Sequence, residues 1–155
     1  MNESPSLTHL REDGSAAMVD ISGKPIVCRE AVAESFISLE SSTLNTITNG
    51  QMPKGDVLAV ARIAGIQAAK KTAELIPLCH QLSLTKVTVD FNVESAGIRI
   101  SATARTDAKT GVEMEALSAV AIAALTIYDM CKAIDKSMSV QSIKLVEKTK
   151  ETATT

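Results

Sequence analysis

The chain has 155 residues, a net charge of −2, and 45% apolar and 22% charged residues. This length favours a single domain, and the slightly acidic charge argues against general nucleic-acid binding. With no Trp, one Tyr and two Phe, the core must be built from aliphatic side chains that bury little area each. The core of one subunit is therefore modest, which favours oligomerisation.

The cysteines and the N-terminus both indicate an intracellular protein. Cys28, Cys79 and Cys131 form an odd, scattered set without CxxC spacing, so a reducing cytoplasm is the simplest interpretation. The opening MNESPSLTHLREDGS is polar and lacks the apolar region of a signal peptide. We expect a flexible arm over residues 1–16, one domain over residues 17–147 and a polar tail over residues 148–155.

The first third of the domain contains one ambiguous segment and one short helix. Residues 26–39 combine Ala and Glu, which favour a helix, with Val, Ile and Phe, which favour a strand. Ser41-Ser42 offers an N-cap for a short helix through Thr48, and Asn49-Gly50 offers a stop.

A second helix is predicted from Val57 to Leu75. Asp56 is placed to cap its N-terminus, and Pro77 lies just beyond its end. The helix is rich in Ala and Gly, so it can approach a neighbouring element closely.

Alternating apolar and polar residues predict a β-hairpin over residues 84–94 and 98–105, with its turn at Ala96-Gly97. Residues 138–146 are predicted to form a last strand. A two-faced antiparallel sheet with helices on one side is an α+β fold.

The longest helical pattern runs from Thr110 to Lys136, and its middle, residues 117–127, is apolar nearly all round. Such a helix is predicted to be buried. Ionisable side chains stand at both its ends, namely Glu113 and Glu115 at the start, and Asp129 and Lys132 near the end. Charges on a buried helix need partners or a functional site.

The spacing of these charges argues against one compact site in one chain. Glu115 and Asp129 are almost four turns apart, so they point the same way but lie ~21 Å apart along the axis. Glu113 and Glu115 are predicted to point to roughly opposite sides. A cleft between subunits can bring these groups together. The alternative is that the helix dipole stabilises the two glutamates in the first turn and that Asp129 and Lys132 form a solvated ion pair.

Two further stretches place ionisable groups beside helix ends. Lys54 precedes a helix N-terminus, where it can meet a phosphate, although a solvated loop lysine is the alternative. His80 follows a helix stop and either joins a site or packs there. Cys79 is interpreted as a packing residue rather than a nucleophile, because adjacent residues in an extended loop point apart.

Four motifs follow one another along the chain: Lys54-Gly55-Asp56 with ARIAGIQAAKKT, then LIPLCH, TGVEMEAL and ALTIYDMCKA. With these motifs the chain resembles the cyclic pyranopterin monophosphate synthase family, the C proteins of molybdenum cofactor biosynthesis. The likeness runs from LTHL at Leu7 and MVDIS at Met18 to about Lys148. It implies ferredoxin-like α+β subunits that assemble in the cytoplasm as a hexamer, a trimer of dimers, with active sites between subunits.

The resemblance also implies a lyase activity. The substrate would be 3′,8-cyclo-7,8-dihydroguanosine 5′-triphosphate, and the products cyclic pyranopterin monophosphate and pyrophosphate. By the same resemblance the catalytic residues are Asp129, Lys132 and Lys54, and the substrate-binding residues are Leu78, Cys79, His80, Glu113, Met114, Glu115 and Arg29. No cofactor is implied; Mg²⁺ is compatible with the chemistry, but no acidic cluster requires it.

Two departures from the family pattern stand out. Gln81 replaces the usual proline after His80, which predicts a looser loop. Residues 147–151 replace a Gly-, Ser- and Lys-rich tail, so any substrate contact made by that tail would be lost. The competing class is a non-catalytic nucleotide-binding module on the same fold. The pairing of Asp129 with Lys132 favours an enzyme, because phosphate binding alone has less need of a carboxylate–lysine pair.

Overall fold

The computed structural model describes residues 10–151. The parts of the predicted arm and tail that fall on residues 1–9 and 152–155 lie outside these described residues. The elements are β1 (Val27–Ser38), α1 (Ser41–Thr48), α2 (Val57–Lys70), α3 (Thr72–Leu75), β2 (Leu84–Glu94), β3 (Gly97–Ala108), α4 (Glu113–Cys131) and β4 (Ser139–Glu151).

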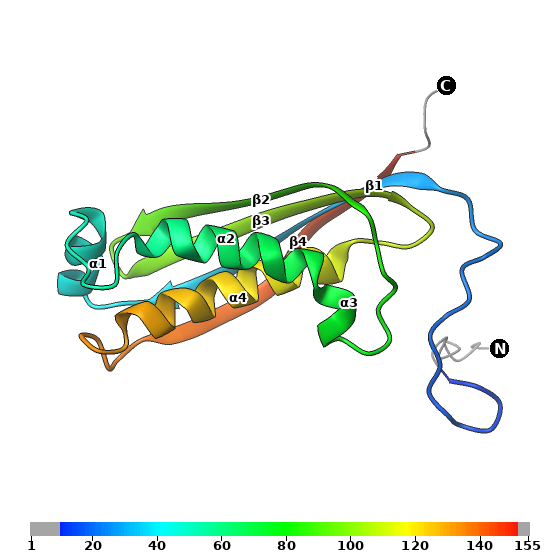
Figure 1. The fold of residues 1–155 in the computed structure, drawn as a ribbon, viewed down its shortest axis with the longest axis horizontal. Helices are drawn as coiled ribbons and strands as arrows, with labels where there is room; N and C mark the ends of the chain where they lie inside the picture. The colour runs from blue at the N-terminus through cyan, green and yellow to red at the C-terminus, as the bar shows by residue number, and fades with distance from the viewer. Residues whose placement is uncertain (1–9, 152–155) are drawn as a thin grey trace, which may run out of the picture.

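The four strands form one antiparallel sheet in the order β2-β3-β1-β4. Figure 1 shows α2 and α4 lying side by side over one face of this sheet. A β-α-β-β-α-β chain path with this strand order is the ferredoxin-like arrangement. The predicted α+β fold and the predicted hairpin are therefore confirmed.

The ambiguous segment 26–39 forms the inner strand β1. It pairs with β3 on one side and with β4 on the other. Its alternate residues Ala31, Ala33 and Ile37 are buried under the helices. Pairing on both edges and burial of one face outweigh the helix preference of Ala and Glu, which is a weak local effect.

The predicted second helix is interrupted near its end. Asp56 caps α2 as predicted, with its Oδ1 accepting a hydrogen bond from the N–H of Ala59 at 3.0 Å. The continuous helix to Leu75 was predicted wrongly, because α2 ends at Lys70 and α3 begins at Thr72. The Thr72 hydroxyl donates to the Ala68 carbonyl at 3.0 Å, a side-chain bond that competes with regular helix geometry.

Helix α4 is the core helix of the domain. Its length and apolar composition would suffice to cross a membrane, but half of it is buried against the sheet and α2. It passes α2 closely at Gly65, where an added Cβ would lie 2.9 Å from the Ala119 carbonyl oxygen. The prediction of a helix buried all round needs one correction, because Leu125 is 54% exposed in the single chain.

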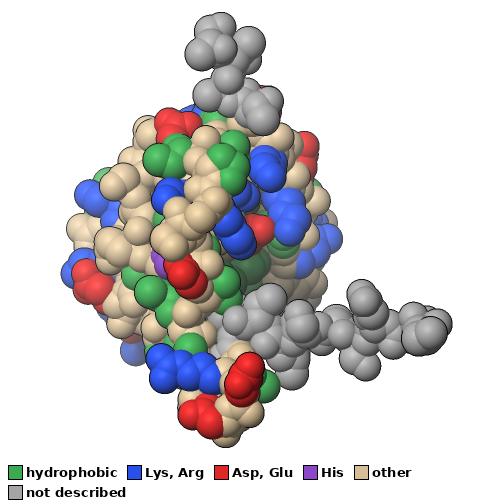
Figure 2. Space-filling model, turned by 90° about the vertical axis from the view of Figure 1, so that its right-hand side faces the viewer, with side chains coloured by type: hydrophobic (Ala, Val, Ile, Leu, Met, Phe, Trp, Pro, Cys, Tyr) green, Lys and Arg blue, Asp and Glu red, His purple; other side chains and the backbone are tan. Residues whose placement is uncertain are grey.

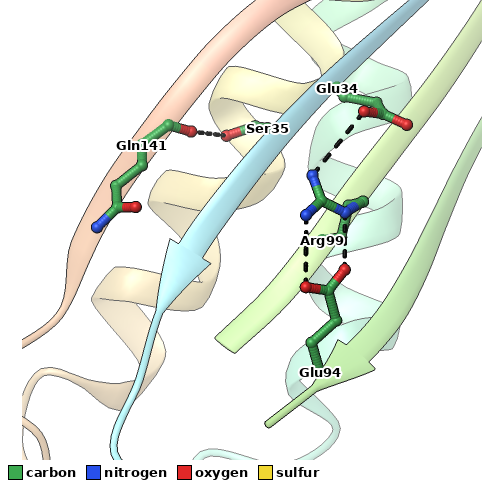
Figure 3. A network of polar contacts seen from close by, with 5 residues as sticks. All are labelled: Glu34, Ser35, Glu94, Arg99 and Gln141. Carbon is green, nitrogen blue, oxygen red and sulfur yellow. Dashed lines mark hydrogen bonds and ion pairs between the residues drawn. The ribbon is translucent and has the colours of Figure 1, made fainter. Parts of the chain in front are cut away.

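The sheet face opposite the helices carries a charged network, shown in Figure 3. Arg99 on β3 donates from Nε to Oε1 of Glu94 at 2.7 Å, and its Nη1 lies 3.9 Å from Oε2 of Glu34 on β1. The same guanidinium lies over the Phe36 ring, 5.5 Å from its centroid. These contacts link three strands on a polar face.

Strand β4 is longer than the predicted strand over residues 138–146. It pairs with β1 as far as Cys28 opposite Glu151. Residues 148–151, predicted as part of a polar tail, therefore belong to the sheet. Their polar sequence carries no strand signal, and the edge of β1 supplies the hydrogen-bond partners that hold them.

Candidate active site

A pocket of about 680 Å³ opens beside the N-terminus of α4. Three segments far apart in the sequence line it, within residues 19–24, 76–82 and 110–115. Figure 2 views this end of the molecule and shows an apolar hollow with acidic and basic side chains around it. The pocket contains six of the predicted substrate-binding residues, namely Leu78, Cys79, His80, Glu113, Met114 and Glu115.

Two carboxylates from the first turn of α4 line this pocket. Glu115 is only 4% exposed, and burial raises its pKa to about 7, with the nearby charge of Glu113 adding to the rise. Glu113 and Glu115, predicted to point to roughly opposite sides of the helix, both line this pocket. Glu113 stands at the start of the helix and folds back over Gly111, where a Cβ would collide with its carboxylate.

The loop after α3 supplies the facing wall. Burial raises the pKa of the Cys79 thiol, and the charge of Glu115 raises it further. Cys79 is therefore a poor nucleophile, which supports its interpretation as a packing residue. The ring of His80 points to the N-terminal segment, and its Nε2 donates to the Val19 carbonyl at 2.7 Å.

Three of the pocket residues that the sequence analysis missed come from the segment before β1. Val19, Ile21 and Lys24 line the pocket. Lys24 brings a positive charge to it. The local pattern around Lys24 is that of a surface turn, so only the return of the chain across the pocket reveals its place.

Arg29 lies beside this pocket rather than in it. It lines a smaller hollow of about 220 Å³ that shares Gly111 and Glu113 with the main pocket. Its guanidinium donates to the carbonyls of Ala108 at 3.1 Å and Lys109 at 3.3 Å, so it fixes the loop before α4.

The β4 extension contributes a lysine to the same hollow. Lys148 Nζ lies 3.3 Å from Oε1 of Glu113. A basic side chain from the altered C-terminal stretch therefore still reaches the edge of the pocket.

The three predicted catalytic residues meet at the other end of α4. Lys132 Nζ lies 2.6 Å from Oδ1 of Asp129, and Lys54 Nζ lies 3.6 Å from Oδ2. Lys54 also donates to the Asp129 carbonyl at 3.1 Å. The hydrogen bond from Lys132 lowers the pKa of Asp129, with the charge of Lys54 adding to it, and the same hydrogen bond raises the pKa of Lys132.

This cluster of Lys54, Asp129 and Lys132 is open to solvent in the single chain. The side chains of Asp129 and Lys132 are 61% and 55% exposed. Neither lies in the pocket at the N-terminus of α4, which is ~21 Å away along the helix axis. The structure thus gathers the predicted residues into two groups and does not join these groups within one chain.

A buried carboxylate next to this cluster escaped the sequence analysis. Asp135 is 1% exposed and accepts hydrogen bonds from the N–H of Glu40 at 2.8 Å and from the N–H and hydroxyl of Ser137 at 2.9 and 2.8 Å. Burial raises its pKa, but these hydrogen bonds outweigh burial and hold the pKa below the usual value. Asp135 therefore ties the turn after α4 to the start of α1.

A model of the MoaC family matches residues 18–151. Cyclic pyranopterin monophosphate synthase of Chloroflexus aggregans is 56% identical over 144 residues, which cover 92% of this chain and 87% of that protein. The protein of the same name from Roseiflexus sp. strain RS-1 is 58% identical over 144 residues, which cover 92% of this chain and 91% of that protein. Because the family match spans both charged groups and the sheet between them, the chain belongs to the MoaC family.

Proposed function

We propose that this chain converts 3′,8-cyclo-7,8-dihydroguanosine 5′-triphosphate into cyclic pyranopterin monophosphate and pyrophosphate, in the cytoplasm. The observation that carries the proposal is the pocket in which residues 78–80 face residues 113–115, in a chain 56–58% identical to proteins named cyclic pyranopterin monophosphate synthase. The free thiols of Cys28, Cys79 and Cys131 suit a reducing compartment.

Glu115 suits the guanine-derived ring of this substrate. Such a ring presents N–H donors, and a carboxylate offers two acceptor oxygens. Its pKa of about 7 also allows Glu115 to give or take a proton near neutral pH. The apolar side chains of Leu78 and Met114 complete a wall against which a flat ring can lie.

The phosphate step needs positive charge where pyrophosphate departs. A substrate hydroxyl attacks the α-phosphorus, the bond from this phosphorus to the bridging oxygen breaks, and the hydroxyl proton passes to a base. We propose Lys24, Lys54 and His80 as the groups that stabilise the phosphates. Over residues 10–151 no three His, Cys, Asp or Glu side chains converge to hold a metal, so we assign no residues to Mg²⁺.

Asp129 and Lys132 are proposed as the acid–base pair that rearranges the ring. In the single chain the hydrogen bond to Asp129 holds the pKa of Lys132 above its usual value. A lysine that must give up its proton needs desolvation, which lowers the pKa of an ammonium group. Contact with a second subunit would supply that desolvation.

We propose that two chains pair with their α4 helices antiparallel, so that the pocket of one chain meets the Lys54–Asp129–Lys132 cluster of the other. Exposed apolar side chains next to that cluster support such a contact, since Leu125 and Tyr128 are 54% and 38% exposed. A further apolar hollow on α2, which contains Val60 and Ile63, offers a second contact surface. Three such dimers would form the proposed hexamer.

The activity is tested by incubating the purified protein with the cyclised triphosphate and measuring pyrophosphate and, after oxidation, the fluorescent pterin. The wild-type chain should release one pyrophosphate for each pterin formed. Lys132→Ala should lower kcat by about 10²–10⁴ and keep the fold, because the ion pair is exposed.

Lys136→Ala is the matched control, because Lys136 Nζ bonds the Lys132 carbonyl at 2.6 Å but lies outside the proposed acid–base pair. It should keep near wild-type turnover. A wild-type protein that releases no pyrophosphate would refute the proposed function, and a fully active Lys132→Ala protein would refute the role of Lys132.

A further inference from the structure

The segment of residues 17–26 forms one wall of the pocket without being a helix or a strand. We call this segment the strap. Figure 1 shows it in blue, running from the start of β1 past the end of the domain that carries α3. Ala17, Val19 and Ile21 are half-buried and alternate with exposed residues, so one side of the strap packs on the domain while the other faces solvent.

Side chains from two other parts of the chain hold the strap by its backbone. His80 Nε2 donates to the Val19 carbonyl at 2.7 Å, and Lys109 Nζ donates to the Ser22 carbonyl at 2.5 Å. Two more hydrogen bonds lie within the strap: the N–H of Ser22 donates to Asp20 Oδ1 at 2.8 Å, and the N–H of Lys24 donates to the Ile21 carbonyl at 3.0 Å. Because a strap without ladder hydrogen bonds depends on such anchors, losing one should loosen it.

Lys109 is well placed to be the anchor nearest Lys24. The carbonyls of Ala108 and Lys109 accept hydrogen bonds from Arg29 of β1, so the backbone that carries Lys109 is fixed to the sheet. The hydrogen bonds from Ser22 lower the pKa of Asp20, and the charge of Lys109 lowers it further. The ammonium of Lys109 therefore bonds a carbonyl of this turn, and its charge also acts on the carboxylate of Asp20 in the same turn.

Lys109 itself does not line the pocket, whereas Lys24 does. Lys24 lies two residues after Ser22, whose carbonyl accepts the hydrogen bond from Lys109. We propose that Lys109 is a positioning residue, which holds the strap against the domain so that the Lys24 ammonium stands at the pocket and meets the anionic substrate. This inference rests on the proposed function for the identity of the substrate, but the anchoring of the strap does not.

The first test compares Lys109→Met, which removes the charge at similar length, with Lys109→Arg, which keeps a donor. Lys109→Met should raise KM about tenfold, the equivalent of one charged hydrogen bond, and change kcat much less. Lys109→Arg should restore most of the affinity. Lys71→Met is the matched control, since Lys71 is exposed at the end of α2 and outside the pocket lining; its KM should equal that of wild type.

A double-mutant cycle tests whether Lys109 acts through Lys24. If it does, Lys24→Met combined with Lys109→Met should have the KM of Lys24→Met alone, because the strap then has no cation left to position. Additive increases in KM would overturn this part of the proposal.

Hydrogen exchange separates the strap from the proposed reaction, because it needs no substrate. The amides of residues 17–26 should exchange faster in Lys109→Met than in wild type or Lys109→Arg, while those of β2 and β3 stay unchanged. Unchanged exchange in the strap would overturn the anchoring role. Faster exchange with an unchanged KM would overturn the positioning role. A wild-type protein without turnover would refute the proposed function and leave the exchange comparison to decide on the anchor.

Discussion

At the scale of single residues, Glu115 is a buried carboxylate in the candidate active site. Its place in the first turn of α4 is favourable for a helix, yet its side chain is buried and its pKa rises to about 7. Burial makes the charged form costly, and a functional site is the usual reason for keeping such a group.

This raised pKa predicts a specific dependence of stability on pH. Below pH 4.5, the ordinary value for Glu, the carboxyl is protonated in both states and carries no penalty. As the pH rises to about 7 the unfolded chain loses this proton and the folded chain keeps it, so stability falls, by up to about 3 kcal/mol. Glu115→Gln should therefore raise Tm above that of wild type at pH 8, and the gain should shrink toward pH 5.

Thermal melts across this pH range check the prediction, with Glu74→Gln as the control for an exposed glutamate of α3. The control should shift Tm little at every pH. A difference between Glu115→Gln and wild type that does not change with pH would show that a cation already compensates the buried carboxylate.

At the scale of elements, the crossing of α2 and α4 depends on Gly65. An added Cβ at this position would lie 2.9 Å from the Ala119 carbonyl oxygen and 3.1 Å from Cγ2 of Val89. A backbone oxygen of a core helix cannot move aside as a flexible side chain can. The two helices must separate or bend to admit even one methyl group.

Gly65→Ala tests this contact because two effects of opposite sign compete. Ala is a better helix former than Gly by about 1 kcal/mol, whereas overpacking a core costs about 1–3 kcal/mol. We expect the cost to dominate and Tm to fall by several degrees. Gly23→Ala is the control, since its Cβ would meet nothing within 4 Å. A Gly65→Ala protein more stable than wild type would show that the helices are not in tight contact.

At the scale of the whole molecule, the two groups of functional residues stand at opposite ends of α4. A shared active site predicts complementation between subunits that are inactive for different reasons. Mixing Glu115→Ala with Asp129→Ala subunits, after dissociation and reassembly, creates sites with an intact pocket from one chain and an intact cluster from the other. With random pairing in dimers, roughly one quarter of all sites should be intact, and activity should recover accordingly.

Mixing Asp129→Ala with Lys132→Ala provides the control for this experiment. Both substitutions damage the same cluster, so no arrangement of subunits restores it and no activity should return. Hybrid formation is verified by native mass spectrometry with one subunit isotopically labelled. Hybrids of Glu115→Ala and Asp129→Ala that form but remain inactive would place both residues in the same chain's site or show that they never meet.

Local pattern alone was sufficient to predict the hairpin of β2 and β3, the α2 cap at Asp56 and the core helix α4. Each depends on interactions between residues close in sequence, such as alternation, side-chain capping and helix propensity. The motifs in these same stretches were specific enough to predict the family. They also indicated six of the residues that line the pocket.

Only the tertiary structure decided which of these residues meet. Residues 27–38 form strand β1 despite their helix-forming Ala and Glu, because β3 and β4 pair with its two edges. Residues 148–151 join the sheet because the backbone of β1 supplies their hydrogen-bond partners. The pocket exists because the strap, the loop after α3 and the start of α4 converge there. These proximities follow from backbone pairing and packing between distant segments, which local periodicity does not encode.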